Sequence, residues 1–305
     1  MTAAAATGGG WGARRRRAFL MGLAPALVVL AGITVAPTLY LLLTSLTPLN
    51  LTLPGTAWDF SEPHYNYLDL WQDERFHLSA WIQAKLSVAT VALQLLAGLG
   101  VALLLHQGGP LRRLARTVFL VPMVLPPIAV GILWRVMYTV DISPFHRLMA
   151  WVGLPVPPLT TDPDLAIWAI VLVDTWEWFP FTMLMVLAAL QMIPDSPVEA
   201  ARIDGASDLQ LFRYVLLPYI APTLVVAGLF RLIDSIKAFP LIYVLTSGGP
   251  GDATTVTNYY AFVQAFNFSL WGYASAIATL MVAAIFLLSW LIDRLTGATD
   301  AARHD

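Results

Sequence analysis

Long apolar runs separated by short polar stretches form the dominant pattern along this chain. Each of six stretches is apolar over about the 20 residues that a helix needs to cross a bilayer. These stretches cover residues 18–43, 86–106, 117–138, 165–193, 215–246 and 270–292. The pattern predicts an all-α integral membrane protein with six transmembrane helices in a membrane domain at 18–293, flanked by tails at 1–17 and 294–305. Pro126 and Pro127 predict a break or kink in the third helix.

The distribution of basic residues predicts how the chain is inserted. Lysine and arginine concentrate in the cytoplasmic segments of membrane proteins. Alternate segments carry Arg14–Arg17, the turn at Arg112–Arg116, Arg202 with Arg213, and finally Arg294 with Arg303. The remaining segments are rich in aspartate and glutamate. Both termini are therefore predicted to be cytoplasmic. The external segment at residues 44–81 either lies at the membrane interface or contacts an external partner.

Composition narrows the class of protein. Hydrophobic residues make up 58% of the chain and charged residues 12%, so the lipid bilayer is the expected solvent. The net charge of −2 argues against nucleic acid as a partner. The chain has no cysteine, and its five histidines are scattered, so neither a metal site nor a catalytic site is predicted.

The polar segment between the fourth and fifth predicted spans indicates two short helices joined by a turn. Asp195 or Ser196 can cap the first helix, and Gly205 permits the turn. A second helix from about residue 208 to 217 places apolar side chains on one face, namely Leu209, Phe212, Val215 and Leu216. Such an elbow suits docking into a groove of another protein, and it equally suits a helix lying on lipid.

Fixed spacings within this segment resemble the signature loop of permease subunits in binding-protein-dependent ABC importers. The pattern is Glu199-Ala200-Ala201, then Gly205, then Val215 and Leu217-Pro218, with valine where isoleucine is usual. The resemblance implies a coupling loop at residues 194–218 that contacts a cytoplasmic ATPase. It assigns coupling to Glu199, Ala200, Ala201, Asp204, Gly205, Leu217 and Pro218. Because this chain has no GxxxxGK[ST] loop, ATP and magnesium are expected on the partner ATPase and no cofactor is expected here.

A second segment, Tyr243 to Ala278, is similar to the Leu-Thr-x-Gly-Gly-Pro region of larger-type permeases in carbohydrate importers, such as those for maltose, lactose and glycerol phosphate. The resemblance implies a type I permease fold in a bacterial-type inner membrane. It also implies three partners: a smaller-type permease, a dimer of ATPase subunits and an extracytoplasmic solute-binding protein. The expected function is alternating-access import of a sugar, oligosaccharide or glycerol-phosphate-like solute, without enzyme activity in this chain.

Ionisable side chains inside the predicted spans are functional candidates, because placing them in a membrane costs several kcal/mol. Arg231, Asp234 and Lys237 recur every three residues and can form two ion pairs along one helix stripe. One helix face of the fourth span carries Asp174, Glu177, Trp178 and Phe181. These seven residues either line a translocation path, where carboxylates and rings would meet a sugar, or pair between helices to fix packing. A rival hypothesis is an ion-coupled secondary transporter that uses the intramembrane carboxylates.

Overall fold

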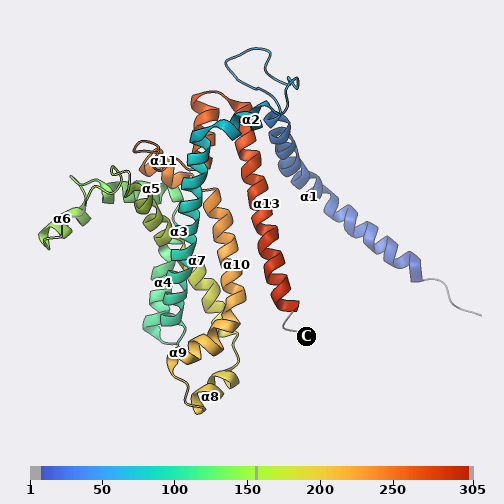
Figure 1. Cartoon of the computed structure of the whole chain (residues 1–305). Helices are drawn as coiled ribbons and strands as arrows, with labels where there is room; N and C mark the ends of the chain where they lie inside the picture. The colour runs from blue at the N-terminus through green and yellow to red at the C-terminus, as the bar shows by residue number, and fades with distance from the viewer. Residues whose placement is uncertain (1–7, 155–156, 302–305) are drawn as a thin grey trace, which may run out of the picture. The chain divides into compact units, whose positions relative to one another are not determined.

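The computed structural model describes residues 8–154 and 157–301, and these residues confirm the all-α class (Figure 1). The helices are α1 (Gly8–Ser45), α2 (Tyr65–Gln72), α3 (Glu74–Leu105), α4 (Pro110–Val124), α5 (Pro127–Tyr138), α6 (Pro144–Trp151), α7 (Ala166–Gln191), α8 (Asp195–Ile203), α9 (Asp208–Leu211), the π-helical turn η1 (Phe212–Leu216), α10 (Leu217–Ile236), α11 (Pro240–Leu245), α12 (Thr257–Phe262), the π-helical turn η2 (Val263–Asn267) and α13 (Trp271–Ala301).

Within the described residues, five helical segments are long and apolar enough to cross a membrane: Met21–Ser45, Glu74–Leu105, Ala166–Gln191, Asp208–Ile236 and Trp271–Ile292. Helices α4 and α5 form a sixth candidate together, but they are bent by 98°. The break that Pro126 and Pro127 predict is therefore confirmed. Helix α4 ends at Val124, because Leu125 precedes a proline and is extended, with φ −74° and ψ 141°. Pro126 is also extended, with φ −62° and ψ 135°, and α5 begins at the next residue.

The fifth predicted span differs from the observed helix at its C-terminal end. The prediction ran to residue 246, whereas α10 ends at Ile236 and the separate helix α11 begins at Pro240. Proline disfavours helical backbone in the residue before it and lacks an N–H donor, so Pro240 starts a new helix. The preceding residue, Phe239, accordingly departs from helical geometry, with φ −144° and ψ −51°.

The chain divides into two compact units. The first comprises Met1–Trp71 and Gln264–Thr279. In this unit the first turn of α13 lies directly against the backbone that follows α1. Gly272 donates its N–H to the carbonyl of Leu49 at 2.9 Å, and a Cβ at Gly272 would collide with the carbonyl oxygen of Thr47. Asn66 donates to the carbonyls of Ser45 and Thr47, each at 2.8 Å, and fixes the same turn.

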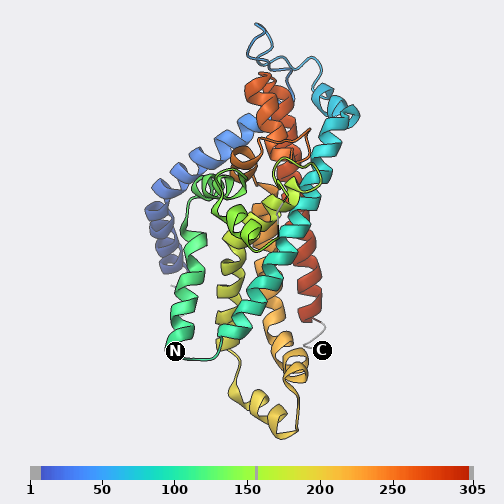
Figure 2. The same cartoon turned by 90° about the vertical axis from the view of Figure 1, so that its left-hand side faces the viewer.

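The second unit comprises Gln72–Val263 and Leu280–Asp305. Its centre consists of α3, α7 and α10, which pack side by side (Figure 2). Two apolar clusters occupy this unit. One surrounds Ile170 and Val173 of α7 with residues of α3, α5 and α11, and the other surrounds Met183 and Val186 with residues of α3 and α10. Along α7, the charged residues Asp174 and Glu177 lie between these two clusters.

Candidate translocation site and coupling loop

Arg231 is the centre of a buried charged cluster. Only 2% of its surface is exposed, and its Nε donates to Oε1 of Gln94 at 2.8 Å. Its Nη1 lies 3.3 Å from Oδ2 of Asp234, and its Nη2 lies 3.8 Å from Oδ2 of Asp174. The guanidinium also lies over the ring of Trp178, 4.4 Å from the centroid. The cluster therefore joins α3, α7 and α10.

Gln94 is the member of this cluster that sequence reasoning missed. Its Nε2 donates to Oδ2 of Asp174 at 2.7 Å and to the Asp174 carbonyl at 3.1 Å, while its Oε1 accepts from Arg231. The side chain is fully buried. A lone amide in the apolar run of the second predicted span was the available signal, because such amides hydrogen-bond across membrane helices.

The predicted stripe of ion pairs on the fifth span is confirmed. Asp234 pairs with Arg231 through Oδ2 and with Lys237 through Oδ1, the latter at 3.1 Å. The Asp234 and Lys237 side chains are 47% and 56% exposed, whereas the Arg231 side chain is 3% exposed. The stripe thus runs from a buried end at Arg231 to an open end at Lys237.

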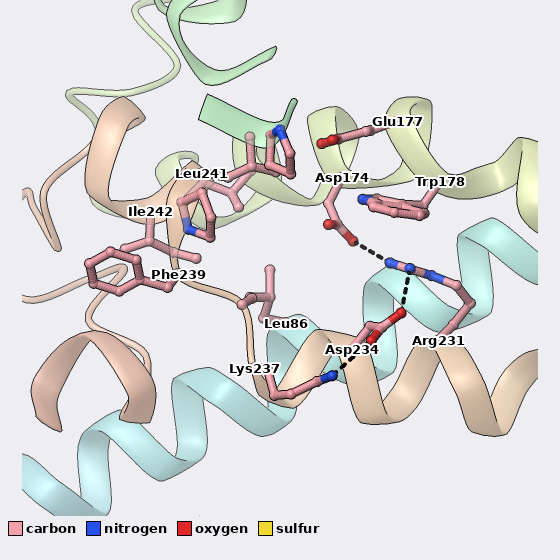
Figure 3. Close-up of a pocket in the computed structure, with 14 residues that line it drawn as sticks. Leu86, Asp174, Glu177, Trp178, Arg231, Asp234, Lys237, Phe239, Leu241 and Ile242 are labelled. Atoms are coloured by element: carbon pink, nitrogen blue, oxygen red, sulfur yellow. Dashed lines mark hydrogen bonds and ion pairs between the residues drawn. The ribbon is translucent and has the colours of Figure 1, made fainter. Parts of the chain in front are cut away.

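A cavity of about 270 Å³ opens beside this cluster (Figure 3). Its polar lining comes from six residues: Asp174, Glu177, Trp178, Arg231, Asp234 and Lys237. Much of the remaining wall is apolar and comes from α11 and the segment before it. The structure therefore brings together six of the seven residues predicted for a translocation path or for interhelix pairing.

Phe181 is the predicted residue that does not line this cavity. It lies one helical turn closer to the coupling loop and packs against Phe230, with ring centroids 6.3 Å apart. Arg135 lies in the last turn of α5 and donates to the carbonyl of Val244 at 3.4 Å. Helix α7 continues through Pro180 without ending there.

Glu177 differs from the other charged residues of the cavity because it has no partner. Its side chain is fully buried, and neither carboxylate oxygen accepts a hydrogen bond. Figure 3 shows this carboxylate turned away from Arg231, whereas Asp174 reaches toward the guanidinium. The Arg231 donors are directed at three protein acceptors. Glu177 is therefore an unused acceptor closed off from solvent beside the cavity, and the Arg231 cation is already engaged by protein groups.

The coupling loop is built around Gly205. Helix α8 ends in a Schellman motif, in which Ala206 donates to the carbonyl of Ala201 at 2.9 Å and Gly205 donates to that of Arg202 at 3.1 Å. This motif requires a left-handed residue, and Gly205 has φ +79°. At the other end of α8, the cap differs from the expectation. Pro194 occupies the cap position, without a side-chain hydrogen bond from Asp195 or Ser196.

The second arm of the elbow begins at a capping box that sequence reasoning did not find. Ser207 accepts from the Gln210 N–H at 3.4 Å, and the Gln210 side chain accepts from the Ser207 N–H at 2.8 Å. The apolar face also differs from the expectation, because Leu209 is 74% exposed whereas Leu211 is 6% exposed. The π-helical turn at Phe212–Leu216 has a wider period, which places Leu211 rather than Leu209 in line with the inward residues that follow.

Most of the predicted coupling residues lie on the surface of this elbow. Exposed positions are Glu199, Ala200, Asp204, Gly205 and Pro218, and partly buried positions are Ala201 and Leu217. Helix α8 has no buried residue, and Ile203 on it is 85% exposed. Figures 1 and 2 show α8 and α9 projecting at one end of α7 and α10. Their contact with an ATPase stays a prediction.

Apolar spanning helices, one of them broken, together with a buried charged cavity define a multi-pass membrane transport protein. The family model described as "Binding-protein-dependent transport system inner membrane component" matches residues 94–300. This chain belongs to that family.

Relatives of known sequence support the assignment. The chain is 35% identical over 282 residues to the probable ABC transporter permease protein y4oQ of Sinorhizobium fredii, covering 92% of this chain and 90% of that protein. It is 38% identical over 228 residues to the trehalose/maltose transport system permease protein MalF of Thermococcus litoralis, covering 74% and 76% respectively. The sulfoquinovosyl glycerol transport system permease protein SmoG of Agrobacterium fabrum is 34% identical over 280 residues, covering 91% and 90%.

A solved structure supports the predicted fold. A chain of the bacterial ABC transporter that imports the acidic polysaccharide alginate superimposes with a TM-score of 0.81 at 18% identity, covering 94% of this chain and 98% of that chain. This likeness shows an ABC permease fold. Together with the family, it makes the chain a permease subunit of an ATP-driven importer, a transport component rather than an enzyme. The rival hypothesis of an ion-coupled secondary transporter is therefore set aside.

Proposed function

We propose that this chain imports a carbohydrate by alternating access, and that the cavity beside Arg231 holds the solute during transit. Relatives named for trehalose and maltose and for sulfoquinovosyl glycerol support a carbohydrate as the solute class. The observation that carries the assignment of the cavity is the buried and unpartnered carboxylate of Glu177.

The cost of burying Glu177 is the reason for this assignment. A buried polar group without a hydrogen bond destabilises a protein by about 1–3 kcal/mol, and more if it is charged. Saccharide hydroxyls would donate to this carboxylate and remove that cost once the motion of transport exposes it, because both oxygens are buried in this conformation. The two hypotheses for the seven predicted residues, solute contact and interhelix pairing, then apply to different members of the set. Asp174, Arg231, Asp234 and Lys237 pair with protein groups, whereas Glu177 serves the solute.

We further propose that the elbow at residues 194–218 seats in a cytoplasmic ATPase subunit that binds ATP and magnesium. Exposure of Glu199, Asp204 and Gly205 supports a contact with another protein. The complete importer would contain two ATPase subunits, a second permease of the smaller type and an extracytoplasmic binding protein. Both termini would lie on the cytoplasmic side of a bacterial-type inner membrane, as the arginine distribution indicates.

Uptake by the reconstituted transporter tests the solute site. Maltose and trehalose would be the labelled solutes, with the transporter containing Glu177→Leu, Glu177→Gln or neither. We expect Glu177→Leu to lower uptake at least tenfold and Glu177→Gln to lower it less, because an amide oxygen still accepts from a hydroxyl. Exposed Glu62 offers a matched control, and Glu62→Leu should transport normally. Unchanged uptake in Glu177→Leu would remove the cavity from the solute path.

Copurification and energy dependence test the assembly. A tagged chain should bring down a second permease and an ATPase, and uptake should require ATP. Glu199→Lys should preserve membrane insertion while ATP hydrolysis no longer drives uptake, whereas Glu62→Lys should leave uptake intact. Uptake driven by a proton gradient in vesicles that lack the ATPase would contradict the proposed assembly, and so would a tagged chain that purifies alone.

A further inference from the structure

We propose that a second cavity in the same unit is an outer site for an uncharged saccharide, which the solute occupies before it reaches the cavity beside Arg231. This inference rests on the proposed function. The second cavity has a volume of about 380 Å³. Its polar lining is Arg135 together with four hydroxyl-bearing residues, Thr139, Thr160, Thr161 and Thr246.

The two cavities lie at opposite ends of the same pair of helices. On α5, Pro127 lines the inner cavity, whereas Arg135 and Thr139 line the outer one. Eight residues of helix separate Pro127 from Arg135, a distance of about 12 Å. On α11, Leu241 lines the inner cavity and Leu245 lines the outer one. One pair of helices therefore connects the two sites.

The order of the cavities follows from the coupling loop. The segment with Thr160 and Thr161 precedes the N-terminal end of α7, and the coupling loop follows the C-terminal end of α7. The inner cavity contacts α7 between these ends, at Asp174 and Glu177. The cavity with Arg135 is thus on the side away from the coupling loop, which is the external side in the proposed orientation.

Close packing of α5 on α11 separates the two cavities. Gly131 lies on α5 between Pro127 and Arg135, and a Cβ at Gly131 would lie 3.0 Å from both Cβ and Cγ1 of Val244 on α11. A contact that tight leaves no room for a sugar ring between these two residues. The two cavities are therefore separate at this point, and a solute would pass directly between α5 and α11 only if these helices moved apart.

Most N–H donors of the Arg135 guanidinium have no acceptor among the described residues, in contrast to those of Arg231. Its side chain is exposed, and the hydrogen bond of its Nη1 to the Val244 carbonyl is long, at 3.4 Å. A guanidinium carries five N–H donors, so most of them remain for a ligand. The hydroxyl of Thr139 donates to the Arg135 carbonyl at 2.7 Å and keeps its lone pairs as acceptors. Donors from arginine and acceptors from threonine match neighbouring hydroxyls of a saccharide, each of which both donates and accepts.

The charged residues that line the inner cavity, beside Arg231, favour a neutral ligand over an anionic one. Arg135 alone would also attract a carboxylate, a sulfonate or a phosphate. A solute that passes both sites must then enter a cavity in which Glu177 is an unpartnered carboxylate and Arg231 already contacts Asp174 and Asp234. The other cation of this cavity, Lys237, is paired with Asp234. An anion brought there would find no free counter-charge among the lining residues, and burying an unpaired charge is strongly unfavourable. An uncharged saccharide can therefore bind in both cavities, whereas an anionic one can bind only in the outer cavity.

Site-directed thiol labelling tests the outer site directly, because the chain has no cysteine of its own. Thr160→Cys places a reporter on the wall of the outer cavity, and Ala238→Cys places one on the wall of the inner cavity. The complete transporter in membrane vesicles would be treated with a small thiol reagent, and labelling of this chain would be counted by mass spectrometry. Probes would be maltose, trehalose and glucose as neutral saccharides, and glucuronate and glycerol 3-phosphate as anions.

We expect at least one neutral saccharide to slow labelling at Thr160→Cys threefold or more, with no protection by the anions. Arg135→Gln should raise the saccharide concentration needed for protection about tenfold. Arg147 is a matched exposed arginine that does not line the cavity, so Arg147→Gln should leave protection unchanged. Absence of protection by every neutral saccharide, equal protection in Arg135→Gln, or protection by either anion would each overturn the outer site as proposed.

The inner reporter separates this inference from the proposed function. Protection at Ala238→Cys without protection at Thr160→Cys would remove only the outer site. Protection at Thr160→Cys without protection at Ala238→Cys would contradict the inner site, and so would inner protection that persists in Glu177→Leu. Protection at both positions, with only the outer one sensitive to Arg135→Gln, is the result that supports two successive sites.

Discussion

Arg231 donates its Nε proton to Oε1 of Gln94 at 2.8 Å, so a charged residue of α10 is joined to a neutral amide of α3. The same amide donates through Nε2 to Oδ2 of Asp174 on α7. Gln94 therefore contacts the cation and the anion together without adding a charge of its own. Because the three side chains come from different helices, this single amide links α3, α7 and α10 through polar contacts.

Replacing Gln94 by leucine should weaken this junction. Gln94→Leu leaves the Nε of Arg231 without an acceptor and Asp174 without its short hydrogen bond. Each lost interhelical hydrogen bond in a membrane protein costs about 0.6–2 kcal/mol, so we expect a loss of about 1–4 kcal/mol in the free energy of unfolding. Unfolding in mixed detergent micelles would measure it. Gln107→Leu makes the same chemical change at an exposed position and should be neutral. Equal stability of the two variants would contradict the role of Gln94.

Removing the buried cation Arg231 should lower the free energy of unfolding more than removing the exposed cation Lys237. Arg231→Met leaves Asp174 as an uncompensated charge, and breaking such a buried pair costs about 3–5 kcal/mol. Lys237→Met breaks the pair with Asp234, whose members are 47% and 56% exposed, and should cost less than about 1 kcal/mol. The double variant Arg231→Met with Asp174→Leu should recover part of the loss. A double variant that is less stable than Arg231→Met alone would contradict the proposed pairing.

The difference between the predicted and observed site follows from the range of each interaction. The pairs within Arg231, Asp234 and Lys237 were predictable, because helix geometry alone places residues three apart on one face. The break at Pro126 was equally local, since proline acts on its own neighbours. Gln94 and Phe181 depended on which helices pack together, and a periodic pattern within one span does not encode the packing partner.

In the coupling loop, too, some features could be predicted from the sequence and others could not. Gly205 was correctly predicted at the turn, because only its backbone freedom permits φ +79° at little cost. The predicted cap of α8 was wrong, because Pro194 occupies the cap position and makes no side-chain hydrogen bond. The Ser207 cap of the second arm was missed, because several polar residues lie near that helix start and the fold selects one of them. Leu209 was assigned inward because an ordinary α-helical period was assumed across what is a π-helical turn.

Loss of the capping box should loosen the second arm of the elbow. Ser207→Ala removes the side-chain acceptor for the Gln210 N–H, and loss of such a cap costs about 0.5–2 kcal/mol. We expect faster amide hydrogen exchange at Asp208–Leu211 while α10 keeps its protection. Ser196→Ala serves as the control, because Ser196 does not cap α8 and its loss should leave exchange in both arms unchanged. Slower or unchanged exchange at Asp208–Leu211 would show that the box does not hold this arm.

Helix α3 packs tightly against α7 at Gly98. A Cβ at Gly98 would lie 2.7 Å from Cγ2 of Thr182 and 2.9 Å from the backbone nitrogen of Met183. Backbone cannot yield as a side-chain end does, so Gly98→Ala must push the helices apart. Overpacking of this kind costs about 1–3 kcal/mol. The displacement would also lengthen the contacts of Gln94, one helical turn away on α3.

Gly100 offers the matched control on the same helix, since a Cβ there would meet nothing within 4 Å. Gly100→Ala should be neutral or slightly stabilising, because alanine favours a helix over glycine by up to about 1 kcal/mol. The two variants would be compared by unfolding in mixed micelles and by uptake in proteoliposomes. We expect Gly98→Ala to lose both stability and transport, because α3 positions Gln94 for the Arg231 cluster. Full stability in Gly98→Ala would mean that α3 and α7 tolerate a wider separation, and the contact at Gly98 would then have no part in holding the site.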